Sequence, residues 1–236
     1  MKLTGTHLGI LVIVLFFTAQ LFADNEITVK QTGGDNFDLT IEQVGANNII
    51  KEHDTTSYVN GANMDLKLIQ YNDTSTNNVI ALWHLDGSGN TIRWAQGAAW
   101  SSATSDTFTY DGDEGGGHYA RLDIHGDNNS VSGFQQNAGS TTGHIYRQLI
   151  FSDDNTVWIK QQNNGQKTID LSTYSDENAV SIVQKGNNAQ HQANVTLNGT
   201  YGTDLNLIQQ GTTTQTYQLT QYCYTVGGCS VSVTQE

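Results

Sequence analysis

A short pattern of alternating residues recurs along the chain and limits what the chain can fold into. Two apolar residues and a glutamine occupy every second position, so that all three lie on one face of a β-strand. The spacings between these glutamines cluster near roughly 25 residues and half that value, which indicates a structural repeat. The pattern ends at Gln31, Gln43, Gln70, Gln96, Gln161, Gln184, Gln209 and Gln221.

Residues that tolerate a positive φ angle follow several of these glutamines. Glycine and asparagine adopt this conformation more readily than other residues, and tight corners need it. A unit of strand, corner, strand and corner is stabilised by stacking on copies of itself. The sequence therefore predicts an all-β fold, a β-solenoid of strand-turn-strand repeats. The predicted corner residues are Gly33, Asn36, Gly45, Asn48, Gly186 and Gly211.

The repeated glutamine has a physical use in such a stack. An inward amide can hydrogen-bond to the same amide in the repeats above and below, at the roughly 4.8 Å strand spacing of cross-β assemblies. The chain has no proline, which fits because every backbone N–H of a stacked strand has a partner. If each rung, meaning one repeat of the stack, takes about 25 residues, the chain after position 23 forms about eight rungs.

The first 23 residues differ from the rest. Lys2 precedes an apolar run at residues 8–17, and Ala23 is the small residue expected at a cleavage site. We expect a signal peptide at residues 1–23 and a secreted protein without stable membrane insertion, because the run is shorter than the roughly 20 residues that span a bilayer. Without Lys2 the net charge is 9 − 23 = −14, which argues against nucleic acid as a partner.

The two cysteines lie close together near the C-terminus. Cys223 and Cys229 flank Gly227 and Gly228, and in an exported protein they are expected to form a local disulfide, with two free thiols as the alternative. We assign residues 24–221 to the repeats, with an irregular stretch at 97–147, and residues 222–236 to a C-terminal hairpin. No motif in the sequence predicts a metal or another cofactor.

The stretch from Asn36 to Asn48 resembles the repeat of the curlin family, the subunits of bacterial curli fibres. Its shared elements are an inward glutamine at Gln43, a corner glycine at Gly45 and the asparagine Asn48. The resemblance implies a structural subunit of an extracellular functional amyloid on the bacterial cell surface, used in biofilm matrix and adhesion. It also implies self-association as a homopolymeric fibre, a nucleator subunit and a curli-type secretion apparatus as partners.

The sequence gives only partial support to other functions. Asp111, Asp113 and Glu114 cluster without a partner base, so we expect no enzyme. The segment 33–38 has only part of a calcium-binding repeat, and the Thr212–Thr214 run occurs once, whereas an ice-binding face needs it in every repeat. A non-polymerising solenoid, capped at both ends and serving as an adhesin or surface-layer module, stays open as the alternative.

Overall fold

The computed structural model describes residues 14–15, 25–27, 31–44, 48–50, 59–71, 78–86, 89, 91–97, 99–100, 108–109, 118–124, 128, 130–137, 144–150, 154, 156–163, 166–173, 177, 179–186, 191–200, 203–211, 215–224, 226 and 228–236. The regular elements among these residues are all β-strands. Within this part of the chain, no helix is long and apolar enough to cross a membrane. The predicted all-β class is confirmed.

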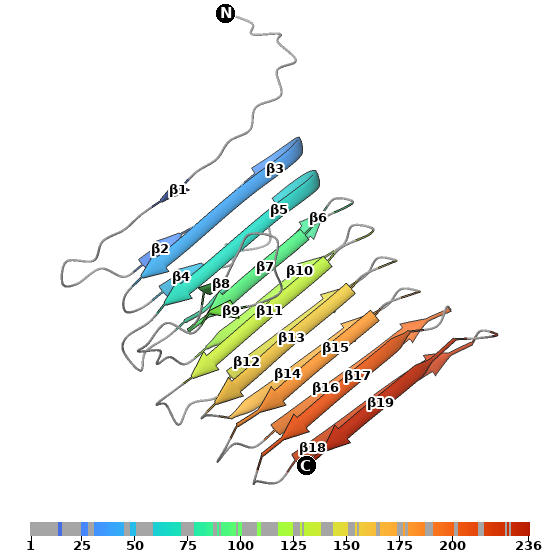
Figure 1. Cartoon of the computed structure of the whole chain (residues 1–236). Coiled ribbons are helices and arrows are strands. Elements are labelled where there is room, and N and C mark those ends of the chain that lie inside the picture. Colours follow the sequence, from blue (N-terminus) through green and yellow to red (C-terminus); the bar gives the residue numbers. More distant parts are fainter. Residues whose placement is uncertain are drawn as a thin grey trace, which may run out of the picture.

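One layer of the molecule contains strands that each pair in parallel with the equivalent strand of the next repeat. Their colours in Figure 1 run from blue to red along the stack. The register between neighbours is continuous over six to eight residues in most pairs. In order they are β3 (Gln31–Val44), β5 (Val59–Tyr71), β7 (Thr91–Gln96), β11 (Ser130–Asn137), β13 (Thr156–Asn163), β15 (Ala179–Lys185), β17 (Asp204–Gln210) and β19 (Ser230–Gln235).

The second layer faces the first and is also parallel. Isolated bridges join Ile49 to Val79 and Val79 to Tyr119, so the stack continues between its first strands. The long strands β3 and β5 run in both layers, because Val59 pairs with β6 and Asp65 pairs with β7. The other members are β2 (Asn25–Ile27), β4 (Asn48–Ile50), β6 (Leu82–Asp86), β10 (Tyr119–Ile124), β12 (His144–Ile150), β14 (Lys167–Thr173), β16 (His191–Gly199) and β18 (Gln215–Cys223).

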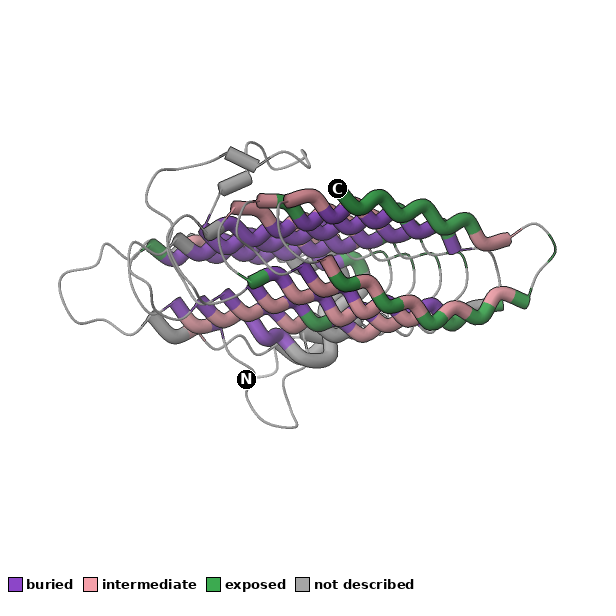
Figure 2. The backbone as a smooth tube through the Cα atoms, turned by 90° about the horizontal axis from the view of Figure 1, so that it is seen from below, coloured by how far each residue is buried: buried purple, intermediate pink, exposed green. Residues whose placement is uncertain are grey.

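Strict alternation of apolar and polar residues places the core between the layers. In β14 every second residue is buried, and the same alternation recurs in β13 and β15. Leu66, Ile92, Ile159 and Ile182 belong to one continuous buried cluster. Figure 2 shows the two layers, with buried residues along both and exposed residues along the strand that leads to the C-terminus. Parallel stacking of a two-layered repeat defines a β-solenoid, as the sequence predicted.

Corners between the layers repeat at a fixed place. Residues with positive φ stand seven positions before successive glutamines of the first layer, namely Asn63, Gly89, Asn128, Asp154 and Glu177. Asparagine, aspartate and glycine suit this conformation, because their side chains are short or absent. Glu177 adopts it without that advantage, which indicates that stacking on the corner before it overrides local preference.

Two assignments from the sequence change. Strands β10 and β11 and the first part of β12 lie inside residues 97–147 and pair in register with neighbouring rungs, so these parts of the stretch belong to the repeats. Residues 222–236 do not form a hairpin, because β18 pairs with β16 and β19 pairs with β17, both in parallel. A parallel partner is available to each strand, and this satisfies more backbone groups than a two-stranded hairpin does.

Three short strands lie outside this pattern. β8 (Ala99–Trp100) and β9 (Phe108–Thr109) pair antiparallel with each other. β1 (Val14–Leu15) pairs in parallel with β3 at Thr40 and Ile41. Two residues of the predicted signal peptide therefore lie against the first strand of the stack in the full chain.

Candidate functional site: polar columns inside the solenoid

A column of glutamines runs through the interior of the first layer. From the second member onward, each side chain donates from Nε2 to Oε1 of the glutamine in the preceding rung, over 2.7 to 2.9 Å. All of them except the last are buried. We call this set the glutamine column; it consists of Gln43, Gln70, Gln96, Gln135, Gln161, Gln184, Gln209 and Gln235.

Each interior member of the glutamine column makes a second bond across the core. The second N–H of Gln70 donates to the backbone carbonyl of Val79 over 3.1 Å, and that of Gln184 donates to Gln192 over 3.0 Å. Equivalent bonds start from Gln96, Gln135, Gln161 and Gln209. Both amide hydrogens are thus satisfied, which removes the cost of burying an amide and ties the two layers together.

The hydrogen bonds of the glutamine column all point the same way. Every donor belongs to the later rung and every acceptor to the earlier one, from Gln43 to Gln235. Gln235 uses its N–H on Gln209, and no described residue donates to its Oε1. The column therefore has a direction, and its C-terminal end presents an acceptor.

The structure brings together six of the eight glutamines singled out from the sequence. Gln221 is not among them, because it lies in the second layer next to Leu197. Gln31 pairs with Val59 at the corresponding register in the first rung. Sequence reasoning missed Gln135, whose unit carries Gly133 in place of an apolar residue, and Gln235, although Val231 and Val233 completed its pattern.

Gly133 has a packing reason. A Cβ atom there would lie 2.2 Å from the indole of Trp94, the residue directly below it in the stack. Trp94 is fully buried and stacks on Tyr146 of the opposite layer with ring centroids 5.2 Å apart. The large indole of one rung is accommodated by the missing side chain of the next.

Of the predicted corner residues, some directly follow a strand, whereas others lie within one. Gly186 and Gly211 follow β15 and β17, and a Cβ on Gly186 would lie 2.6 Å from the backbone oxygen of Asn163. Gly33 and Asn36 are within β3, near its register shift. Gly45 lies outside the described residues. Asn48 is buried in β4 and accepts a 3.0 Å hydrogen bond from Asn78.

Asn48 opens a second column of polar residues, on the interior of the second layer. Consecutive members occupy equivalent register positions in neighbouring rungs. All but the last are buried, and the rings of His118 and His144 stack with centroids 5.0 Å apart. We call this set the histidine column; it consists of Asn48, Asn78, His118, His144, Lys167, His191 and Gln215.

The ionisable members of the histidine column are held towards their neutral forms. Burial lowers the pKa of His118 to about 3. The pKa of His144 falls well below 6.5 through burial and then through the charges of His118 and Lys167. Burial lowers the pKa of Lys167 to about 8, and burial together with Lys167 lowers the pKa of His191 to about 4.

Hydrogen bonds to described residues do not offset the cost of burying the three imidazoles. Neither ring nitrogen of His118, His144 or His191 has a hydrogen-bond partner among the described residues. Lys167 donates to the backbone oxygen of Asn163. Among the described residues no carboxylate contributes to the four pKa shifts, and protonation would place positive charges that repel one another in adjacent rungs.

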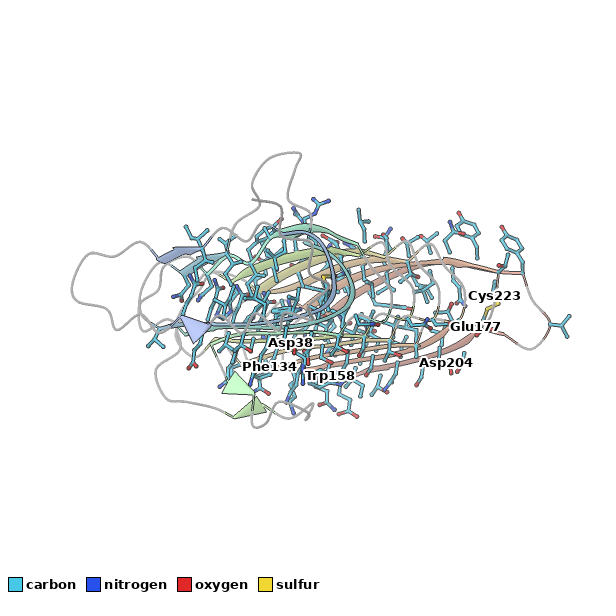
Figure 3. All side chains as sticks on the ribbon, turned by 90° about the horizontal axis from the view of Figure 1, so that it is seen from above. Asp38, Phe134, Trp158, Glu177, Asp204 and Cys223 are labelled. Atoms are coloured by element: carbon cyan, nitrogen blue, oxygen red, sulfur yellow. A yellow bond between two sulfur atoms is a disulfide. The ribbon has the colours of Figure 1, made fainter. Side chains whose placement is uncertain are left out.

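The last rung ends in a disulfide-closed corner. Cys223 and Cys229 are bonded, as predicted. Figure 3 shows Cys223 at the same end of the strands as the corner residue Glu177. Tyr222 and Tyr224 next to the bond are exposed and stack on each other, with centroids 6.4 Å apart. Within the described part of the chain, no three histidine, cysteine or acidic side chains are placed to hold a metal.

Fold and interior columns together define the chain as a β-solenoid with a continuous amide ladder. No family model matches the chain, and neither a curated protein nor a solved structure matches it.

Proposed function

We propose that the protein is the structural subunit of an extracellular, curli-like fibre that grows by stacking one solenoid on the next. Each subunit contributes about eight rungs, and its strands lie perpendicular to the fibre axis as in cross-β assemblies. The fibre serves in biofilm matrix and surface adhesion, with a nucleator and a dedicated export apparatus as partners.

The direction of the glutamine column carries this proposal. Because each amide donates to the one before it, Gln43 of an arriving copy can donate to Gln235 Oε1 of the copy already in place. The hydrogen bonds then continue across the junction with the same direction from donor to acceptor. A column that reversed or ended in an apolar residue would stop at one molecule.

The exposure of the last rung supports the same function. Val231 and Val233 are the register partners of the buried Leu205 and Leu207, yet they are 41% and 38% exposed. They face the same way as core residues and are exposed because no further rung lies on them. An unpaired strand with apolar inward residues is a template for another strand.

The first rung accepts a strand too. Val14 and Leu15 pair in parallel with Thr40 and Ile41 of β3. Cleavage of the predicted signal peptide would remove this short strand and leave β3 available to another copy. Retention of β1 would instead cover the edge of β3 and favour the capped adhesin. The pairing of β1 with β3 is therefore the observation that supports this second candidate.

The test is assembly of purified residues 24–236. We expect thioflavin-positive fibres with a meridional reflection near about 4.8 Å. Val233→Lys should block growth because it places a charge on the last edge, whereas Thr220→Lys, on the exposed outer face of β18, should leave growth intact. If residues 24–236 stay monomeric in sedimentation even with added seeds, the fibre is excluded and the capped adhesin replaces it.

A further inference from the structure

A third column of the solenoid has glutamine only at its two ends. Successive strand pairings place one residue of each rung at the same register position in the second layer. The residues between the two ends are apolar except for one threonine. In order, the column consists of Gln31, Val59, Leu85, Ile124, Ile150, Thr173, Leu197 and Gln221.

Gln221 has no matching neighbour within its own chain. Its register partner Leu197 is buried, and Gln221 itself is partly exposed at the end of the stack. No hydrogen bond joins its side chain to another described residue. An amide that becomes buried without a hydrogen-bond partner is strongly unfavourable, whereas an amide facing a second amide is not.

We infer that Gln221 of one copy pairs with Gln31 of the next and sets the register of the subunit junction. This inference rests on the proposed head-to-tail fibre and identifies the contact that selects the partner. The amide pair would be formed at every junction and at no position inside a subunit, where the same column is almost entirely apolar. It therefore distinguishes the correct end from any other exposed edge.

The histidine column agrees with this register. The histidine column ends at Gln215, and Asn25 stands at its equivalent position in the first rung, opposite Asn48. Gln215 precedes Gln221 by six positions, and Asn25 precedes Gln31 by six. Because the two spacings are equal, one register between the copies brings amides together at both positions. A slip by one residue would bring Gln221 against Lys30 or Thr32.

The test is a coupling experiment on residues 24–236 that compares Gln31→Leu, Gln221→Leu and the double variant. Each single change places leucine opposite an amide at the junction, so we expect seeded elongation to slow about tenfold. The double change places leucine opposite leucine in an apolar column, and we expect elongation to return to within about threefold of the original rate. Thermal unfolding of the soluble variants checks that each one folds.

The results separate this inference from the function on which it rests. One outcome is that the unaltered protein forms fibres while the elongation rate of the double variant falls by the product of the two single reductions. In that case the junction pair is wrong and the fibre proposal is unaffected. If single changes have no effect, the pair is wrong as well. If the unaltered protein forms no fibre, both are overturned.

A second measurement covers the case in which a leucine variant does not fold. The same register places Ser232 of one copy beside Thr40 of the next, both facing outward. Fibres from Ser232→Cys protein mixed with Thr40→Cys protein should form an intermolecular disulfide on oxidation. Ser232→Cys mixed with Asp38→Cys, two residues out of register, should cross-link far less. Equal cross-linking of the two mixtures would overturn the register.

Discussion

The glutamine column and the histidine column occupy the same interior but solve the problem of burial differently. Every interior glutamine is neutral and hydrogen-bonded both to its neighbours along the stack and across the core. The histidine column places His118, His144, Lys167 and His191 in consecutive rungs, and the imidazole nitrogens have no partners among the described residues. The glutamine column stabilises the stack at any pH, whereas the histidine column makes the stability of the stack depend on pH.

The difference shows what a repeating position requires. A side chain that both donates and accepts can bond to copies of itself without limit, as an amide does. An imidazole has one donor and one acceptor when neutral but two donors when charged, so identical charged neighbours repel. A solenoid can tolerate such a column only while its imidazoles stay neutral. Four predictions break or sharpen this contrast.

Acid should have the largest effect. The unfolded histidines titrate near 6.5 and the folded ones lower, so the unfolded chain binds more protons and stability falls as the pH drops below about 6.5. For His118, with a folded pKa of about 3, the loss reaches about 2 kcal/mol by pH 5. His144 and His191 add losses of the same sign. Urea unfolding of seed-free protein from pH 8 to pH 4 measures this loss.

The matched control for the acid effect replaces the three imidazoles with the amide that opens the same column. His118→Asn, His144→Asn and His191→Asn together should flatten the dependence on pH between 6.5 and 4. A slope that persists in the triple variant would assign acid sensitivity to carboxylates elsewhere.

Interrupting the glutamine column should have the next largest effect. Gln161→Leu leaves Gln135 without a donor and Gln184 without an acceptor, and both are buried. We expect a loss of about 2 to 3 kcal/mol in the free energy of unfolding, independent of pH. Gln218→Leu on the exposed face of β18 is the matched control and should change stability by less than about 0.5 kcal/mol. Similar losses in both variants would contradict the importance of the column.

Making the histidine column resemble the glutamine column should stabilise the protein. Lys167 is charged at pH 7 in both states, but its folded pKa of about 8 records a cost of burial. Lys167→Gln removes the charge and keeps a donor for the carbonyl of Asn163. We expect about 1 to 3 kcal/mol of added stability at pH 7 and a raised pKa for His144 and His191, seen by NMR titration. A destabilised variant would mean that the lysine makes a needed contact.

The disulfide should have the smallest effect on the whole molecule. Its loop is short, so the chain-entropy contribution is about 2 kcal/mol at most and acts on the last rung. Cys223→Ser with Cys229→Ser should speed amide hydrogen exchange in β18 and β19 while leaving β11 to β15 unchanged. Mass spectrometry of the unaltered protein should find the pair two hydrogens lighter than the dithiol. Global unfolding on reduction would contradict this local role.

Sequence reasoning found most units with a complete pattern, although it missed Gln235, and it failed where a residue is determined by its neighbour in another rung. Gln135 was missed because Gly133 breaks the pattern, and Gly133 is there because Trp94 of the rung below occupies its space. Gln221 was misplaced because its own strand reads like those of the first layer. Only the strand register, which pairs Gln221 with Leu197, assigns Gln221 to the second layer.

The sequence by itself determined the all-β class, the repeat length, most of the glutamine column and the cysteine pair, since alternation and spacing are local properties of the chain. Tertiary structure decided which positions meet. No local signal relates His118, His144, Lys167 and His191, which are separated by 23 to 26 residues and share no motif. They form a column because parallel stacking places equivalent positions about 4.8 Å apart. Burial in that column, and for His144 and His191 also the charge of neighbouring members, lowers pKa values that are unshifted in an unfolded chain.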